Sequence, residues 1–323
     1  MKKNTKRFIQ TILLGLTLPL SSIAKAAEDS PTSPPQPNST KRVVPDPEKS
    51  RIQALEDTLK QNHLAHQINI LQAQGSPFLT LYRSALTGDS QGCAILLQSD
   101  NEHPDWPSVI SPLRNALPKY SWCTVSIEIP DITKRAQAVK IPTKPLATDT
   151  QDTPSKTITL PNQEMVFARI QATIDDAKSK GNNKQFVFIG YGTGAAYALH
   201  FLAQNKTLGD ALILIDTLTP SPTTDYDLAQ ELSVIEQPVL DYYFDDSAQA
   251  LRFAVWRKQA ANQRKGETGE FTQLTATDEA NAPVEDVQQV LQRVRGFLKQ
   301  NTAQTEQLKS IPAYKKGLFY ESP

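Results

Sequence analysis

Apolar residues recur along this chain in short continuous runs that are separated by amphipathic stretches. A short continuous apolar run is typical of a strand buried on both faces of a sheet. Such runs predict central strands at Cys93–Gln98, Trp122–Ile129, Gln185–Ile189, Ala211–Asp216 and Pro238–Phe244. Further strands are predicted at Gln67–Leu71, Phe78–Ala85 and Phe271–Ala276.

Between these runs, apolar residues spaced three and four apart predict amphipathic helices. The predicted helices are Arg51–Asn62, Asp105–Leu117, Asn162–Lys180, Gly194–Asn205, Ser247–Arg264 and Pro283–Gln300. Pro107 and Pro112 lie inside the second of these, which must therefore start late or kink. Strands that alternate with helices predict an α/β protein with a mostly parallel central sheet and helices on both faces.

The two ends of the chain differ in composition from its centre. Residues 1–26 have a basic start, a short apolar run and a small-x-small ending at Ala24-Lys25-Ala26, which predicts a signal peptide cleaved near Ala26. Residues 27–50 are rich in proline and polar residues and are expected to form a disordered tether. We expect one domain at 51–303 with a polar surface insertion at 131–160, followed by a loose tail at 304–323.

Charge and metal-ligand patterns exclude several function classes. The chain has 34 basic and 34 acidic residues, so no strong field would attract nucleic acid or anionic lipid. Its four histidines and two cysteines show no metal-ligand spacing, and we expect no metal. The predicted signal peptide makes the periplasm the expected location. The apolar run before Ala26 is too short for a retained transmembrane anchor, so we expect no membrane span in the mature chain.

Cys93 and Cys123 are the only cysteines, and each stands near the start of its own predicted strand. In an oxidising compartment they could form a disulfide if the two strands are neighbours. Side chains of neighbouring parallel strands point side by side, which makes the bond geometrically demanding. Two buried free thiols are the alternative.

A glycine-dense turn follows the predicted strand at Gln185–Ile189. It reads Gly190-Tyr191-Gly192-Thr193-Gly194 and leads into a helix of small residues. This layout resembles the nucleophile elbow of α/β-hydrolases, G-x-S-x-G, except that Gly192 stands where the serine would be. The turn lacks the spacing of a dinucleotide or Walker loop, and no cofactor is expected. Anion binding at the helix N-terminus and an ordinary strand-to-helix turn remain alternatives.

Other segments extend the resemblance to α/β-hydrolases over residues 65–300. Ile95–Trp106 resembles their oxyanion-hole strand and loop, with Gln98-Ser99 where His-Gly is common, and Pro238–Asp246 resembles the strand that supplies the triad acid. More narrowly, the chain is similar to the uncharacterised bacterial domain-of-unknown-function family 3530. The matching segments are Asp105–Pro107, Pro112–Pro118, Gly190–Ala196 and Arg293–Leu298. The resemblance implies an α/β-hydrolase-like fold and no particular reaction.

A serine-type mechanism needs a nucleophile, a base and an orienting acid. Asp245 or Asp246 could supply the acid, with Asp216 a weaker candidate, and each could equally be a solvated loop residue. No histidine follows His200, which lies inside the predicted elbow helix and is expected to pack against a neighbour. His103 lies in the loop after a predicted strand and could approach the turn as a base. The alternative is that it is an exposed loop histidine with no catalytic role.

Thr193 follows the apex of the turn by one residue, and its hydroxyl is more simply a helix cap than a nucleophile. The favoured hypothesis is therefore an exported pseudoenzyme that binds an unknown small molecule or envelope protein. Its expected binding cleft is formed by Gln98, Ser99, Gly190, Tyr191, Gly192, Thr193 and Gly194. The alternatives are a hydrolase that uses Thr193, His103 and Asp245 or Asp246, and an interaction module that docks through residues 28–50 and 131–160.

Overall fold

Eight strands form one sheet in the computed structural model, which describes residues 46–132, 158–182, 184–266, 268–276 and 283–302. In chain order the strands are β1 (Ile68–Ala73), β2 (Ser76–Arg83), β3 (Gly92–Leu97), β4 (Trp122–Ile127), β5 (Phe186–Tyr191), β6 (Ala211–Ile215), β7 (Val239–Phe244) and β8 (Phe271–Ala276). Their order across the sheet is β1-β2-β4-β3-β5-β6-β7-β8. The β1–β2 and β2–β4 pairs are antiparallel and all other pairs are parallel, which confirms the predicted fold class.

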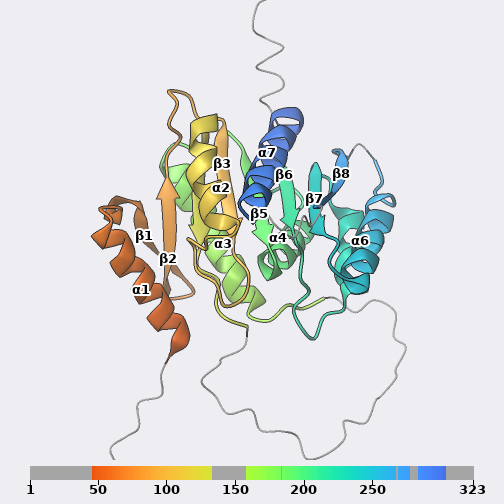
Figure 1. Ribbon diagram of the computed structural model, residues 1–323, viewed down its shortest axis with the longest axis horizontal. Helices are drawn as coiled ribbons and strands as arrows, with labels where there is room; N and C mark the ends of the chain where they lie inside the picture. Colours follow the sequence, from red (N-terminus) through yellow and green to blue (C-terminus); the bar gives the residue numbers. More distant parts are fainter. Residues whose placement is uncertain (1–45, 133–157, 183, 267, 277–282, 303–323) are drawn as a thin grey trace, which may run out of the picture. The chain divides into compact units, whose positions relative to one another are not determined.

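Helices cover both faces of this sheet (Figure 1). They are α1 (Pro47–Gln61), α2 (Ile110–Ala116), α3 (Gln163–Ser179), α4 (Thr193–Gln204), α5 (Asp225–Gln230), α6 (Ala248–Ala261) and α7 (Pro283–Asn301), with 3-10 turns η1 (Ala65–Gln67), η2 (Leu117–Tyr120) and η3 (Glu231–Val234). Because strand side chains alternate between faces, β3 sends Ile95 to the core beneath α3, α4 and α6 and Leu96 to the core beneath α2 and α7.

Three local predictions need correction. Helix α1 begins at Pro47, with the side chain of Asp46 as its cap, so it starts inside the segment expected to be a tether. The first residue predicted for the second helix, Asp105, lies before α2, which begins at Ile110; this is the late start that Pro107 predicted. Helix α5 and turn η3 were missed, since six and four residues are too few to show a helical period.

Several predicted segments lie wholly or partly outside the described residues. They are the signal peptide at 1–26, most of the tether at 27–50, the centre of the insertion at 131–160 and nearly all of the tail at 304–323. The two ends of the insertion are described, and both are packed. Asp131 forms an ion pair with Arg51 of α1 at 2.5 Å, and Leu160 is buried in the core with α3.

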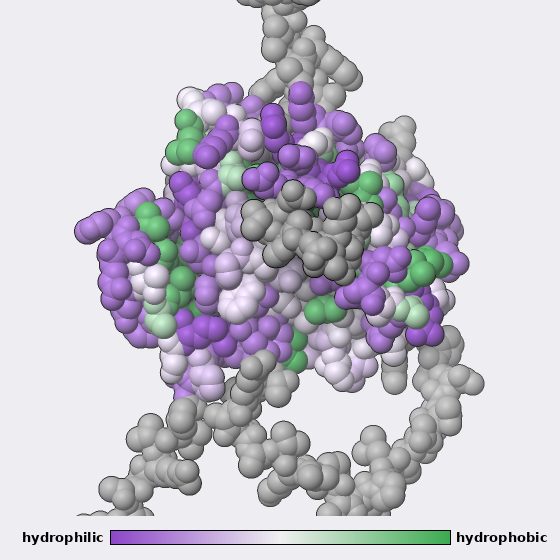
Figure 2. Space-filling model, in the orientation of Figure 1, coloured by the Kyte–Doolittle hydropathy of each residue, from purple (hydrophilic) through white to green (hydrophobic). Residues whose placement is uncertain are grey.

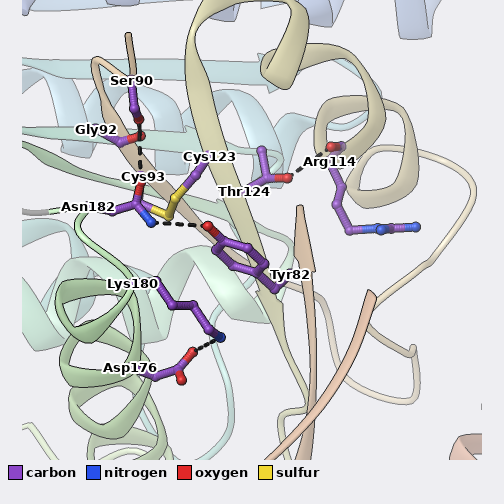
Figure 3. Close-up of a disulfide and its surroundings, with 10 residues drawn as sticks. All are labelled: Tyr82, Ser90, Gly92, Cys93, Arg114, Cys123, Thr124, Asp176, Lys180 and Asn182. Carbon is purple, nitrogen blue, oxygen red and sulfur yellow. Dashed lines mark hydrogen bonds and ion pairs between the residues drawn. A yellow bond between two sulfur atoms is a disulfide. The ribbon is translucent and has the colours of Figure 1, made fainter. Parts of the chain in front are cut away.

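Cys93 and Cys123 form a disulfide between β3 and β4 (Figure 3). The two residues face each other directly in the parallel register, with their Cα atoms 4.4 Å apart. The first of the two alternatives for the cysteines is therefore confirmed. Each cysteine is the second residue of its strand, so the bond links β3 and β4 at their amino-terminal ends.

The visible surface in Figure 2 is mostly hydrophilic, with apolar residues in small separate groups. Exposed apolar side chains include Leu251 and Val255, which lie on α6. Within the ranges that the structure describes, none of the helices is both long and apolar enough to cross a membrane.

Candidate functional site

The turn between β5 and α4 has the geometry of a nucleophile elbow. Gly192 forms its apex with φ 57° and ψ −123°, a conformation that a side chain makes costly. The amide of Gly192 donates to the carbonyl of Ile215 at 3.0 Å, and its carbonyl accepts from the amide of Leu218 at 3.0 Å. The loop after β6 therefore holds the apex in place.

Close packing around the turn explains its two outer glycines. A Cβ at Gly194 would lie 2.3 Å from the carbonyl oxygen of Leu97 at the end of β3. A Cβ at Gly190 would lie 2.3 Å from the Cα of Ala195. The absence of both side chains lets the turn pack against the end of β3 and lets α4 start directly after the apex.

Ser99 occupies the space where a nucleophile at the apex would begin. A Cβ built on Gly192 would lie 2.3 Å from Ser99 Oγ and 2.7 Å from Ser99 Cβ. The same Oγ accepts a hydrogen bond from the Thr193 amide at 3.2 Å. In α/β-hydrolases the amide after the nucleophile stabilises the oxyanion. Ser99 thus fills the nucleophile position and engages the corresponding amide.

Thr193 does not cap its helix, and that part of the prediction was wrong. Its Oγ1 accepts a hydrogen bond from the backbone amide of Asp100 at 2.7 Å, and α4 has no side-chain cap. Thr193 Oγ1 also lies 3.5 Å from Ser99 Oγ. The hydroxyl therefore ties the loop after β3 to the start of α4.

The candidate base has partners in its own loop. His103 Nδ1 accepts from the amide of Asp105 at 3.2 Å, and the ring packs edge-on against Trp106 with centroids 5.2 Å apart. Burial lowers the pKa of His103, an effect partly opposed by the charge of Asp105. Among the described residues, no hydrogen bond joins His103 to Thr193.

The remaining candidates come from the end of β7 and from α4. Asp245 and Asp246 follow β7 and are exposed. His200 is buried in α4, as expected, with Nδ1 2.6 Å from Glu231 Oε1 and Nε2 2.9 Å from Gln163 Oε1. These contacts tie α4 to η3 and α3 and account for the buried imidazole.

The carboxyl ends of β3 and β5 bring together five residues of the expected cleft, namely Gln98, Ser99, Tyr191, Gly192 and Thr193. Leu97 pairs with Gly190 in the parallel register, so Gln98 and Tyr191 each follow at the next position of their strands. Burial raises the pKa of the Tyr191 hydroxyl, and the neighbouring Ser108 side chain partly opposes that shift.

Two partly buried carboxyl groups follow β3 and β6: Glu102, which sequence reasoning missed, and Asp216, which it ranked only as a weaker candidate for the acid. Glu102 Oε2 accepts from the Ser99 amide at 3.0 Å, and burial raises the pKa of the carboxyl from 4.5 to about 7. Burial and the charge of Asp246 raise the pKa of Asp216, which Arg257 partly lowers. Glu102 lies three residues after Ser99 in an acidic loop, a pattern that could have suggested it.

The strand order and the elbow define the fold as that of the α/β-hydrolases. Est1E from Butyrivibrio proteoclasticus has the same fold, with 11% identity, a TM-score of 0.50, and coverage of 73% of this chain and 98% of its own. Dienelactone hydrolase from Anabaena variabilis matches at 12% identity and a TM-score of 0.50, covering 73% of this chain and 100% of its own. At such identities the likeness concerns the fold alone.

The chain belongs to the family described as proteins of unknown function, DUF3530, whose model matches residues 8–300. This confirms the resemblance inferred from the sequence. No curated protein was found to match the chain in sequence.

Proposed function

We propose that this chain is an exported α/β-hydrolase-like protein that has lost serine hydrolysis and binds a ligand or partner in the periplasm. The observation that carries the proposal is the packing of Ser99 against Gly192. A Cβ at the apex would meet Ser99 Oγ at 2.3 Å, so a nucleophile does not fit there while Ser99 keeps its position.

The other parts of a serine-type site support the same proposal. The Thr193 amide already donates to Ser99, so an oxyanion would have to displace that contact. The sequence has no histidine after His200, and His200 is buried among hydrogen-bonding partners inside α4. Loss of the nucleophile or of the base alone lowers the catalytic rate by orders of magnitude. In this chain Gly192 replaces the nucleophile, and no histidine occurs where the base would be.

Turnover of p-nitrophenyl esters tests the loss of catalysis. We expect the purified mature chain to hydrolyse acetate, butyrate and octanoate esters no faster than a heat-denatured sample. The proposal fails if turnover persists through purification and disappears in Thr193→Val or Asp246→Asn. Thr207→Val is the matched control, because Thr207 is an exposed threonine before β6. Turnover lost only in the site variants would favour the hydrolase that uses Thr193, His103 and Asp245 or Asp246.

Export is proposed from the N-terminal sequence, with its basic start and Ala24-Lys25-Ala26 ending. Expression of the full chain in a Gram-negative host should place it in the periplasmic fraction. Mass spectrometry should find a mature N-terminus at Ala27. Recovery of the uncleaved chain in the cytoplasm would contradict the proposal.

A further inference from the structure

Helix α6 presents an apolar stripe to the solvent. Its inner side packs on the core through Phe253 and Ala260, whereas Leu251 and Val255 are 43% and 45% exposed. Figure 2 shows a hydrophobic patch among hydrophilic residues over α6. Residues three and four apart lie on one side of a helix, and a surface helix normally turns polar residues outward. The exposed residues on this side, called the α6 stripe below, are Ala248, Leu251, Val255, Lys258 and Gln259.

Helix α5 holds α6 in a fixed orientation from the flank of the stripe. Tyr226 packs edge-on against Trp256 with ring centroids 5.7 Å apart, and Gln249 Nε2 donates to Asp225 Oδ2 at 3.0 Å. The guanidinium of Arg252 lies 5.8 Å from the centre of the Trp256 ring, on the same flank. The stripe is therefore a preformed surface with one charged residue.

Opposite charges stand at the two ends of the stripe. Asp245 and Asp246 lie just before the start of α6, and Lys258 lies in its last turn. All three are exposed, and none has an ion-pair partner among the residues that the structure describes. A surface with an acidic end and a basic end is complementary to its own reversed copy.

An antiparallel pair of α6 helices would bring these opposite charges together. If the centre of the pair lies midway between Leu251 and Val255, Lys258 is five residues away, or about 7.5 Å along the helix axis. Asp246 is seven residues from the centre in the other direction, or about 10 Å. A two-fold axis reverses the second helix, so Lys258 of each copy falls beside Asp246 of the other.

We infer that the α6 stripe is the surface through which two copies of this chain pair, with their α6 helices antiparallel around a two-fold axis. Leu251 and Val255 would meet their counterparts at the centre, where most apolar surface leaves water. Parallel pairing would instead place Lys258 against Lys258. A lipid surface would accommodate the two aliphatic side chains, but it would leave the reversal of charge along the stripe unused.

This inference goes beyond the proposed function, because it concerns α6 and holds whether or not the chain hydrolyses esters. Sedimentation equilibrium of the mature chain from about 5 to 500 µM measures the pairing directly. We expect a dissociation constant of roughly 10–100 µM, because one helix pair buries less surface than a standard interface. A chain that stays monomeric up to about 500 µM would overturn the inference and leave the stripe to a different partner.

A charge at the centre of the stripe should prevent pairing. Val255→Glu places two carboxylates near the two-fold axis, and we expect it to weaken the dimer about 100-fold. Its urea midpoint at low concentration should match that of the wild type, because the side chain is exposed. Lys119→Glu is the matched control, since Lys119 is exposed on η2 and Leu117 of η2 packs on the other face of the sheet. It should change the dissociation constant by less than about two-fold.

An exchange of charges tests the antiparallel arrangement. Lys258→Glu alone, and Asp245→Lys combined with Asp246→Lys, should each weaken self-pairing about ten-fold, because attraction becomes repulsion at both symmetric contacts. In a mixture of the two variants every such contact is again between opposite charges. With one variant carrying a fluorophore, sedimentation should therefore detect a heterodimer about as tight as the wild-type dimer.

Three results would overturn the inference even if the wild-type chain dimerises. They are a dimer that Val255→Glu leaves intact, a Lys119→Glu variant as weak as Lys258→Glu, and a mixture no tighter than its separate components. The first two would place the interface away from α6, and the third would exclude the antiparallel pairing. None of them bears on the ester assay.

Discussion

Substitution of Gly192 by alanine measures how strongly Ser99 fills the apex of the elbow. The added Cβ would lie 2.3 Å from Ser99 Oγ and 2.7 Å from Ser99 Cβ, while Leu218 Cδ1 at 3.6 Å is an ordinary contact. Forcing an extra carbon into a packed space costs about 1–3 kcal/mol. The conformation at φ 57° and ψ −123° costs a further 1–3 kcal/mol, roughly, for a residue with a Cβ.

A double-mutant cycle with Ser99→Gly separates these two contributions. Glycine at position 99 removes both atoms that the new Cβ would meet, so only the conformational part of the Gly192→Ala penalty should remain. We therefore expect Gly192→Ala to destabilise the wild-type chain by about 2–6 kcal/mol and the Ser99→Gly chain by about 1–3 kcal/mol. The coupling free energy should be about 1–3 kcal/mol.

Urea unfolding of the purified mature chain, followed by circular dichroism, gives the four free energies of unfolding. Gly181→Ala is the matched control, because Gly181 also has a positive φ, of 83°, and has no atom within 4 Å of an added Cβ. Its penalty should be the same in the wild-type chain and in the Ser99→Gly chain. An equal cost of Gly192→Ala in both backgrounds would refute the conclusion that Ser99 fills the apex.

Three further measurements test other features of the structure. Replacement of both Cys93 and Cys123 by alanine should lower the free energy of unfolding by up to about 3–4 kcal/mol in urea. The disulfide closes a loop between cysteines 30 positions apart, and its loss frees the unfolded chain. An unchanged urea midpoint would count against the disulfide. Arg257→Ala should lower the free energy of unfolding by about 3–5 kcal/mol in the same assay, because it leaves the buried Asp241 without its counter-charge. A decrease of less than about 1 kcal/mol would argue against the Arg257–Asp241 ion pair. The pKa of Glu102 is raised from 4.5 to about 7 in the folded state, so the folded chain keeps a proton that the unfolded chain has lost, and stability should fall as the pH rises through that window. Melting temperatures from about pH 4.5 to pH 7.5 should show this fall in the wild type and a smaller one in Glu102→Gln.

The order and type of the main strands could be predicted because the fold makes them apolar on both faces. Every residue of β3, β4 and β6 is buried, and such strands appear as continuous apolar runs. Helix α5 gave no comparable signal. Its six residues make fewer than two turns, and only the Thr224 cap, which accepts from the Asp227 amide, marked its start.

The candidate site was predictable in position but not in its contacts. Glycine spacing revealed the elbow, and Gln98-Ser99 was correctly expected beside it. The role of Ser99 depends on how closely the loop after β3 approaches the turn, a distance set by Gly194 against the carbonyl of Leu97. The disulfide was equally undetermined, because it required β3 and β4 to be neighbours with Cys93 and Cys123 in the same register.

The disulfide also changes the covalent topology of the candidate site. Cys93 and Cys123 close a ring of the backbone that contains Ser99, Glu102 and the whole of α2. A protease that cuts one peptide bond within this ring leaves both fragments in a single molecule while the sulfurs stay oxidised. After such a cut the disulfide still joins Ser99 covalently to the rest of the protein, so its contact with Thr193 can persist. Reduction of the disulfide would remove this covalent link.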